Sequence, residues 1–288
     1  MTAGLLQEVV DYAGTFPPAR LDVSAAVRQY AQYRRGPARW LLGRLILPLP
    51  SLEPGAGLFR DTLDGLPWVM SVIVQAEDLP SFQPRELEAL HEGRVFIHSI
   101  EVPPCEPARI RRAPHVRRGR ETFFEVPIGP GASERLDAIA AAGAGAKVRT
   151  GGLEPRAFPS AEELAGFLFA CSERQIPFKA TAGLHHPFRS IRKLGEESGG
   201  AEVLMHGFVN LAVAACLLNA GVIGVGEVVE VLEERDPGAF AFEERSIEWR
   251  GRKMGVPDIQ DGRRSFFRSF GACSFEEPVE GLREARLL

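Results

Sequence analysis

Short apolar runs alternate with helical segments along the whole chain, and this alternation limits the folds that the chain can adopt. Proline, glycine or a capping pattern separates each apolar run from the helix that follows it. Nearly continuous apolar runs are typical of strands buried on both faces of a parallel sheet. We expect strands at residues 9–13, 40–48, 67–75, 94–102, 122–128, 146–150, 178–182 and 265–275.

Seven or eight such strands separated by helices fit a (β/α)8 barrel, which takes roughly 250 residues. The chain has 288 residues. An open doubly wound sheet is the competing fold, but the turn after the first strand reads GTFPPA and lacks the GxGxxG pattern. We therefore predict an α/β, TIM-like barrel in a single domain over residues 1–288. A hairpin at 246–254 forms a small insertion before the last strand, and residues 202–220 form one buried helix.

Charge and composition exclude several classes of function. A net charge of −4 argues against general nucleic-acid binding. The segment 109–120 holds six arginines, but without interleaved aromatics it is interpreted as a solvated loop or a contact in a homo-oligomer. No signal peptide or apolar run of about 18 residues is present, so we expect a cytoplasmic protein without a membrane partner. Without CxxC, HxH or HExxH spacing, neither a metal nor a cofactor is predicted.

The strands at 146–150 and 178–182 carry most of the candidate catalytic residues. Side chains alternate along a strand, so Lys147 shares a face with Arg149, and Lys179 shares a face with Thr181. In a barrel, inward side chains at the carboxyl ends of neighbouring strands meet above the core. We expect these four residues to converge there with Glu125 from the preceding strand.

Lysine is scarce in this chain, which has four lysines against thirty arginines. Unlike arginine, a lysine amine can lose its proton. Burial and nearby positive charge lower the pKa of such an amine and make it a nucleophile that forms a Schiff base with a carbonyl compound. Lys179, ahead of Lys147, is the predicted nucleophile, with Glu125 as a further catalytic residue. A buried salt-bridge layer that only fills the barrel is the competing interpretation.

The motifs on these strands resemble those of a known family. VRTGG, followed one helix later by FKATAG, is similar to strands six and seven of deoxyribose-phosphate aldolase and related class I aldolases, whose signatures approximate KTSTG and KxxGG. The resemblance covers about 40 residues. It implies that Lys179 is the second lysine, which tunes the site, and that Thr150 and Gly151 belong to the threonine and glycine turn.

The same resemblance puts Arg149 at the place of the Schiff-base lysine. Arginine does not form that intermediate, so either Lys179 or Lys147 takes the role, or the barrel catalyses a different reaction. Proton transfer next to a carbonyl or carboxylate, with lysine as the base and Arg149 holding the anion, fits the residues equally well.

The loops after the last two strands supply polar groups and small residues. His185 and His186 are candidate general acids or bases, and Arg189 is a candidate ligand for the substrate. His206 and Asn210 share a helix face and are interpreted either as substrate ligands or as a helix cap with a buried hydrogen bond. Barrels often bind phosphate through backbone amides of this region, so the last group is expected to bind an anion: Gly183, Gly271, Cys273 and Ser274.

These residues together predict a lysine-dependent lyase of aldolase type, or an isomerase, that acts on a small anionic carbonyl or carboxylate compound such as a phosphorylated one. Two alternatives stay open. One is a catalytically silent barrel that binds an anion. The other is an enzyme in which Cys273, paired with His185 or His186, acts as the nucleophile.

Overall fold

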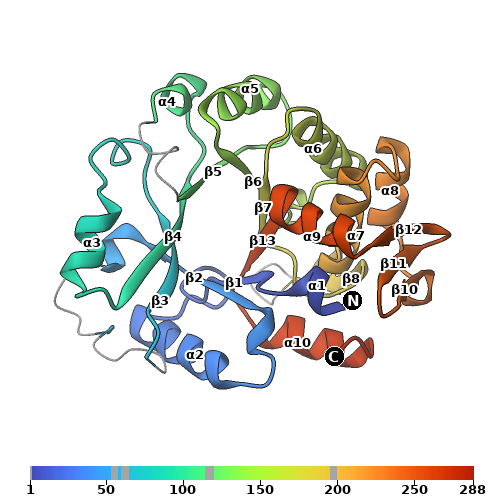
Figure 1. Ribbon diagram of the computed structural model, residues 1–288, viewed down its shortest axis with the longest axis horizontal. Coiled ribbons are helices and arrows are strands. Elements are labelled where there is room, and N and C mark those ends of the chain that lie inside the picture. Colours follow the sequence, from blue (N-terminus) through green and yellow to red (C-terminus); the bar gives the residue numbers. More distant parts are fainter. Residues whose placement is uncertain (1, 53–57, 60–64, 114–119, 195–199) are drawn as a thin grey trace.

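Eight parallel strands close into a barrel in the computed structural model, which describes residues 2–52, 58–59, 65–113, 120–194 and 200–288 (Figure 1). The strands follow the order of the chain around the barrel, and the last one, β13, pairs with β1 to close it. This confirms the predicted (β/α)8 architecture. The barrel strands are β1 (Val10–Tyr12), β2 (Leu42–Pro48), β3 (Trp68–Ile73), β4 (Val95–Val102), β5 (Glu121–Glu125), β6 (Gly145–Arg149), β7 (Phe178–Thr181) and β13 (Phe267–Ala272).

Helices surround the barrel and bury their apolar faces against it (Figure 1). Most of the apolar strand residues are buried, as the nearly continuous apolar runs predict. The helices are α1 (Thr2–Leu6), α2 (Val23–Arg35), α3 (Pro84–Leu90), α4 (Pro107–Arg111), α5 (Ala132–Ala142), α6 (Ala161–Glu173), α7 (Phe208–Asn219), α8 (Val225–Glu233), α9 (Val256–Asp261) and α10 (Glu276–Glu284).

Helix α6 joins the two strands that carry the candidate lysines. It begins with the predicted capping box, in which the amide of Glu163 donates to the Ser160 hydroxyl at 3.2 Å and the Ser160 amide donates to the Glu163 carboxylate at 2.8 Å. A cap of this kind stabilises a helix by about 1 kcal/mol. The apolar stripe of α6, from Leu164 to Cys171, is buried and fixes β6 beside β7.

Two small antiparallel sheets are inserted between β7 and β13. The predicted hairpin before the last strand is present as β11 (Ser246–Trp249) and β12 (Arg252–Gly255), and β10 (Phe240–Phe242) adds a third strand. A short helical turn, η6 (Gly262–Phe266), then leads into β13.

The prediction of one helix over residues 202–220 is wrong at its start. β8 (Ser190–Lys193) pairs with β9 (Glu202–Met205) in a hairpin that follows β7. Helix α7 begins only at Phe208, whose amide donates to the carbonyl of His186 at 3.0 Å. The loop after β7 therefore supplies the carbonyl that caps this helix, and the hairpin extends the rim of the barrel.

Part of the arginine-rich segment 109–120 lies outside the described residues, at 114–119. Within the described part, Arg109 and Arg111 form surface ion pairs with Glu77 and Glu134, both at 3.7 Å. None of the helices in the described part of the chain has the length and apolar character that a membrane crossing requires.

Candidate active site

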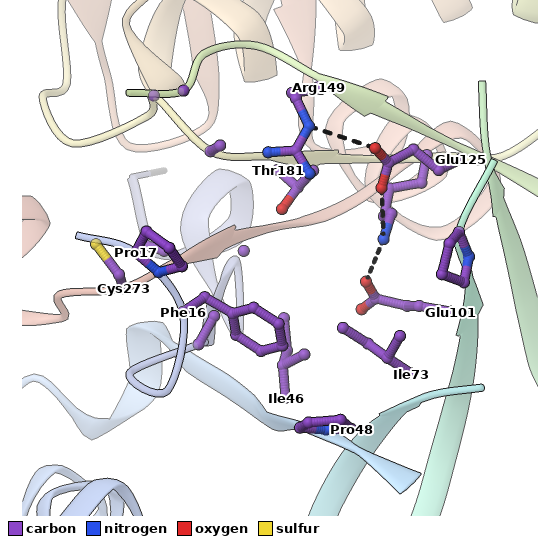
Figure 2. A pocket seen from close by; sticks show the side chains of 18 of the residues that line it. Phe16, Pro17, Ile46, Pro48, Ile73, Glu101, Glu125, Arg149, Thr181 and Cys273 are labelled. Carbon is purple, nitrogen blue, oxygen red and sulfur yellow. Dashed lines mark hydrogen bonds and ion pairs between the residues drawn. The ribbon is translucent and has the colours of Figure 1, made fainter. Parts of the chain in front are cut away.

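A cavity of about 560 Å³ opens at the carboxyl ends of the barrel strands. One wall is apolar, and the other carries charged groups from β4, β5 and β6 (Figure 2). In Figure 2, Phe16, Ile46 and Ile73 lie on the apolar side, and Glu101 and Glu125 lie on the charged side. The cavity thus offers a small ligand both a surface for carbon chains and a cluster of ionised groups.

A row of alternating charges crosses the barrel interior and ends at this cavity. The row follows from strand geometry, since every second side chain of a barrel strand points inward and the carboxyl ends of the strands face the same opening. Each member contacts the next through an ion pair between 2.6 and 3.6 Å long. In order from the amino end of the barrel, this charged row is Arg44, Asp11, Lys179, Glu101, Lys147, Glu125 and Arg149.

Lys147 lies in the upper part of the charged row and lines the cavity. Its amine is 3.1 Å from a carboxylate oxygen of Glu101 and 3.0 Å from one of Glu125. Only 4% of the residue is exposed, so its contact with solvent is confined to the cavity that it lines. A ligand that enters the cavity meets this amine between two carboxylates.

Lys179 lies one step lower, and only 1% of its surface is exposed. Its amine is 2.6 Å from a carboxylate oxygen of Asp11 and 2.6 Å from one of Glu101, and it lies 5.5 Å from the centre of the Phe123 ring. Burial opposes its charge, but the two carboxylates outweigh burial and raise the pKa of the Lys179 ammonium. The predicted lowering of this pKa is therefore wrong, and Lys179 is not among the cavity-lining residues.

The two acids below the cavity are fully buried and ionised. Burial alone raises the pKa of a carboxyl, but the nearby cations win at both positions. Lys179 and Arg44 hold the pKa of Asp11 below its ordinary value, and Lys179 and Lys147 do the same for Glu101. Two serine hydroxyls donate to these carboxylates, Ser71 to Glu101 and Ser269 to Asp11, and Ser99 donates in turn to the hydroxyl of Ser71.

Arg149 stands at the upper end of the charged row, with 53% of its side chain exposed. Its guanidinium donates to the Glu125 carboxylate at 3.3 Å and leans over the cavity (Figure 2). Its partner Glu125 also accepts from Lys147, so one carboxylate links the buried amine to the exposed cation. An anionic group of a ligand has access to Arg149 from solvent.

The ends of β6 and β7 touch each other beside the cavity. Thr150 is buried and its hydroxyl donates to the carbonyl of Ala182. A Cβ added to Gly183, whose φ is +76°, would lie 2.8 Å from the Cα of Gly151, so both positions need glycine. Thr181 and Gly183 line the cavity. Thr150 and Gly151 instead make the contacts that hold the two strand ends together.

No protein-family model, curated protein or solved structure matches this chain. The likeness to class I aldolases therefore rests on the two strand-end motifs and on the closed parallel barrel that carries them.

The end of β13 contributes Gly271 to the cavity, and the loop after it contributes Cys273. Burial raises the pKa of the Cys273 thiol, which disfavours the reactive thiolate. Figure 2 shows this side chain beside Pro17, across the cavity from Glu101 and Glu125. Ser274, by contrast, accepts a hydrogen bond from the amide of Glu277 at 3.3 Å at the start of α10.

The two adjacent histidines point to different places. His185 lines the cavity, and its Nδ1 lies 2.5 Å from the carboxylate of Glu277. His186 lines an adjoining cavity of about 340 Å³ together with Arg192 and Lys193 of the β8–β9 hairpin. Burial lowers the pKa of His186, so its imidazole is neutral near pH 7. His185 is the histidine that a ligand of the main cavity reaches.

Arg189, His206 and Asn210 do not contribute to the cavity, so their predicted role in substrate binding is wrong. The Arg189 guanidinium donates to Nδ1 of His206 at 2.9 Å, and the other ring nitrogen donates to the carbonyl of Pro159 at 2.8 Å. Burial lowers the pKa of His206 to about 4. Asn210 accepts from the Arg189 amide and donates to two carbonyls near the end of α8. The alternative interpretation of His206 and Asn210, buried hydrogen bonding, agrees with these contacts, and Arg189 belongs to the same network.

Sequence reasoning missed Asp11 and Glu101 as members of the site. Each is the acidic residue of an otherwise apolar or uncharged strand segment, VVDYA and IHSIEV. A lone charge inside such a run is a usable signal, because it costs several kcal/mol to bury without a partner. Among the described residues, no group of three or more histidines, cysteines or acids has the geometry to hold a metal ion.

Proposed function

We propose that the chain is a lyase of aldolase type in which Lys147 forms a Schiff base with a small carbonyl compound that carries an anionic group. One observation carries the proposal: of the four lysines, Lys147 is the one whose amine faces the cavity at the carboxyl end of the barrel. Active sites of such barrels lie at this end. The role of nucleophile, predicted for Lys179 ahead of Lys147, is thus assigned to Lys147 in this proposal.

The two carboxylates beside Lys147 fit the proton transfers that a Schiff base needs. The ammonium first gives a proton to Glu125, and the free amine then attacks the carbonyl carbon of the substrate. Glu125 returns the proton to the carbinolamine oxygen, which leaves as water, and a protonated iminium remains on Lys147. In a substrate with a β-hydroxyl, the bond between the α- and β-carbons then breaks: its electron pair passes to the iminium to form an enamine, the β-carbon leaves as an aldehyde, and the hydroxyl proton goes to ionised Glu125. Glu125 returns this proton to the enamine carbon, and water hydrolyses the resulting iminium to release the second product and free Lys147. Glu101, held by Lys179 and Ser71, stays ionised and stabilises the positive charge.

The aldolase signature supports the same lysine when it is aligned on its threonine and glycine. In KTSTG the lysine precedes the threonine by three positions. Lys147 precedes Thr150 by three positions in the segment KVRTG, so Lys147 takes the place of the Schiff-base lysine and Arg149 falls on the serine. This alignment replaces the one that put Arg149 at the place of that lysine. Lys179 keeps the place of the second lysine. The resemblance therefore favours Lys147 as the nucleophile and leaves Arg149 free to bind an anion.

The walls of the cavity suggest the class of substrate. Arg149 and His185 are available to a carboxylate or phosphate at the open side, and Thr181 offers a hydroxyl. Phe16, Ile46 and Ile73 suit a short carbon chain. A carbonyl compound of a few carbons with one terminal anionic group could contact the charged wall and the apolar wall at the same time.

A second candidate function is a barrel that binds an anion without catalysis. The ion pairs of Lys147 favour it, because two carboxylates at about 3 Å already engage its amine. In that case Arg149 would bind the anion and the lysines would only balance the buried acids.

Borohydride trapping separates these two functions. The protein is incubated with short aldehydes and ketones bearing a carboxylate or phosphate, reduced, and analysed by intact mass and peptide mapping. We expect one adduct, on the peptide that contains Lys147, and none in Lys147→Arg. The matched control Lys253→Arg, at an exposed lysine of β12, should label as the wild type does. Absence of any adduct, or an adduct that persists in Lys147→Arg, would refute the Schiff-base mechanism.

A further inference from the structure

A second polar cavity lies at the amino ends of the barrel strands, opposite the candidate active site. Its volume is about 280 Å³, and it is formed where the segment before β1 and the starts of β2 and β13 meet η6. Four of its eight lining residues are arginines and one is an acid. The lining residues are Gly4, Gln7, Glu8, Arg44, Gln260, Arg263, Arg264 and Arg268.

Arg263 is fixed in this cavity entirely by neutral groups. Its guanidinium donates to the backbone carbonyls of Leu5, Gln7, Phe267 and Arg268, and it lies 5.4 Å from the centre of the Phe267 ring. Among the described residues, no carboxylate lies within ion-pair distance of it. Burial lowers the pKa of Arg263 to about 10, and the neighbouring Arg44 and Arg268 contribute to this. The positive charge at this position is not compensated.

The neighbouring arginines are only partly neutralised. Arg268 pairs with Glu121 at 2.8 Å, but its buried Nε has no hydrogen-bond partner in the described part of the chain. Arg44 is 3.6 Å from Asp11, which it shares with Lys179, and its other contacts are to the ring of His98. The carboxylate of Glu8 is the one acid that lines the cavity. A dense set of guanidinium donors therefore surrounds a space with little negative charge.

We infer that this cavity binds a compact tetrahedral oxyanion, either inorganic phosphate or the terminal group of a small phosphate monoester. Guanidinium groups match the oxygens of a phosphate with paired, directional donors, which we assign to Arg264 and Arg268. Four N–H contacts of Arg263 go to carbonyls, so this residue contributes its fixed positive charge. Gln7 and Gln260 add neutral donors at the edge. The site is separate from the cavity of Lys147, because Asp11 and Lys179 of the charged row lie between Arg44 at this end and Glu101 at the other.

Calorimetric titration of the full chain with inorganic phosphate at low ionic strength tests this site. The most informative substitution is Arg264→Gln, because that side chain is 82% exposed and its ion pair is with Asp261 at 3.3 Å, so its loss leaves the fold intact. We expect about tenfold weaker phosphate binding in Arg264→Gln and no measurable binding at this site in the double variant Arg264→Gln, Arg268→Gln. Glycerol phosphate in a parallel titration shows whether the cavity also admits a monoester.

Two controls locate the bound phosphate. Arg149→Gln removes the side chain that is proposed to bind an anion at the opposite end of the barrel. Arg283→Gln removes an exposed arginine of α10. Both should keep the binding that Arg264→Gln weakens, and phosphate should raise the melting temperature of both by more than that of the double variant, which retains only the anion site at Arg149. If the double variant does not fold, Arg264→Gln alone decides. No phosphate binding in the wild type, or equal binding in the wild type and Arg264→Gln, overturns the proposal.

Discussion

Lys147 and Lys179 are paired in register on neighbouring strands, and two carboxylates hold each of them. They differ in what lies above them. Lys147 faces an open cavity, whereas Lys179 is covered by the upper part of the charged row. In a tilted barrel, side chains of adjacent strands form successive layers, and the layer decides access to solvent. The two lysines have similar ion-pair partners and differ in whether they line the cavity. Access to the cavity therefore makes Lys147 the candidate nucleophile and leaves Lys179 a structural role.

Replacement of Lys147 by arginine tests the upper half of this comparison and should have the largest effect. The charge stays between Glu101 and Glu125, so the fold is retained, but no Schiff base forms. Loss of a covalent catalytic group lowers turnover by roughly 10⁴-fold or more. Single-turnover trapping with the best substrate of the panel measures it, with circular dichroism as the folding control. Transfer of the adduct to Lys179 in this variant would show that the two lysines are interchangeable.

Replacement of Lys179 by methionine tests whether this lysine has a structural role. It leaves Asp11 and Glu101 buried with one cation fewer, and breaking a buried pair in this way costs about 3–5 kcal/mol. Urea denaturation should show that loss in the free energy of unfolding. The exposed control Lys253→Met should change it by less than about 0.5 kcal/mol. Equal stability of the two variants would contradict a structural role for Lys179.

The pH dependence of stability sharpens the comparison further. Because Asp11 and Glu101 have pKa values below their ordinary 3.8 and 4.5, the unfolded chain binds protons that the folded chain does not. Their stabilisation is complete above about pH 5 and is lost as the pH falls toward their folded pKa values, with a slope of about 1.4 kcal/mol per pH unit for each proton. Urea denaturation between pH 6 and 2.5 should show a shallower decline in Glu101→Gln than in the exposed control Glu173→Gln. A parallel decline in both would mean that the row contributes nothing to this dependence.

The smallest expected effect is at the upper end of the row. Arg149→Gln removes a mostly exposed cation, so substrate affinity should fall by about tenfold while the adduct still forms on Lys147. The concentration dependence of trapping gives this affinity. Arg156→Gln, an exposed arginine after the same strand, serves as its control and should be neutral. A loss of adduct at saturating substrate would instead place Arg149 in the chemical step.

The sequence predicts the barrel well because strand and helix periodicity are local properties. It also brings Lys147, Lys179, Glu125 and Arg149 together, since neighbouring parallel strands open at one end. It does not reveal that Asp11 pairs with Lys179, because that contact depends on closure of the barrel between β1 and β13.

Two other features of the site depend on three-dimensional packing in the same way. The depth of each lysine is fixed by strand tilt and register, which the pattern of residues does not contain. Arg189 and His206 were misassigned because polar residues that satisfy one another in the interior have the same composition as polar residues that bind a ligand. A single acidic residue in an apolar strand, such as Asp11 or Glu101, is the sequence feature that indicates a buried ion pair.

The strict alternation of the charged row has a consequence for the proposed reaction cycle. A protonated iminium carries the same single positive charge as the ammonium that it replaces, so the covalent intermediate leaves the sequence of plus and minus signs unchanged. Once Glu125 has returned the proton that it accepted, both carboxylates beside Lys147 carry the same charge with the iminium as with the ammonium, and Glu101 keeps its charge throughout. The fixed charges of the barrel interior would then stabilise the covalent intermediate as well as they stabilise the free enzyme. No free energy would be spent on reorganising these charges during the reaction.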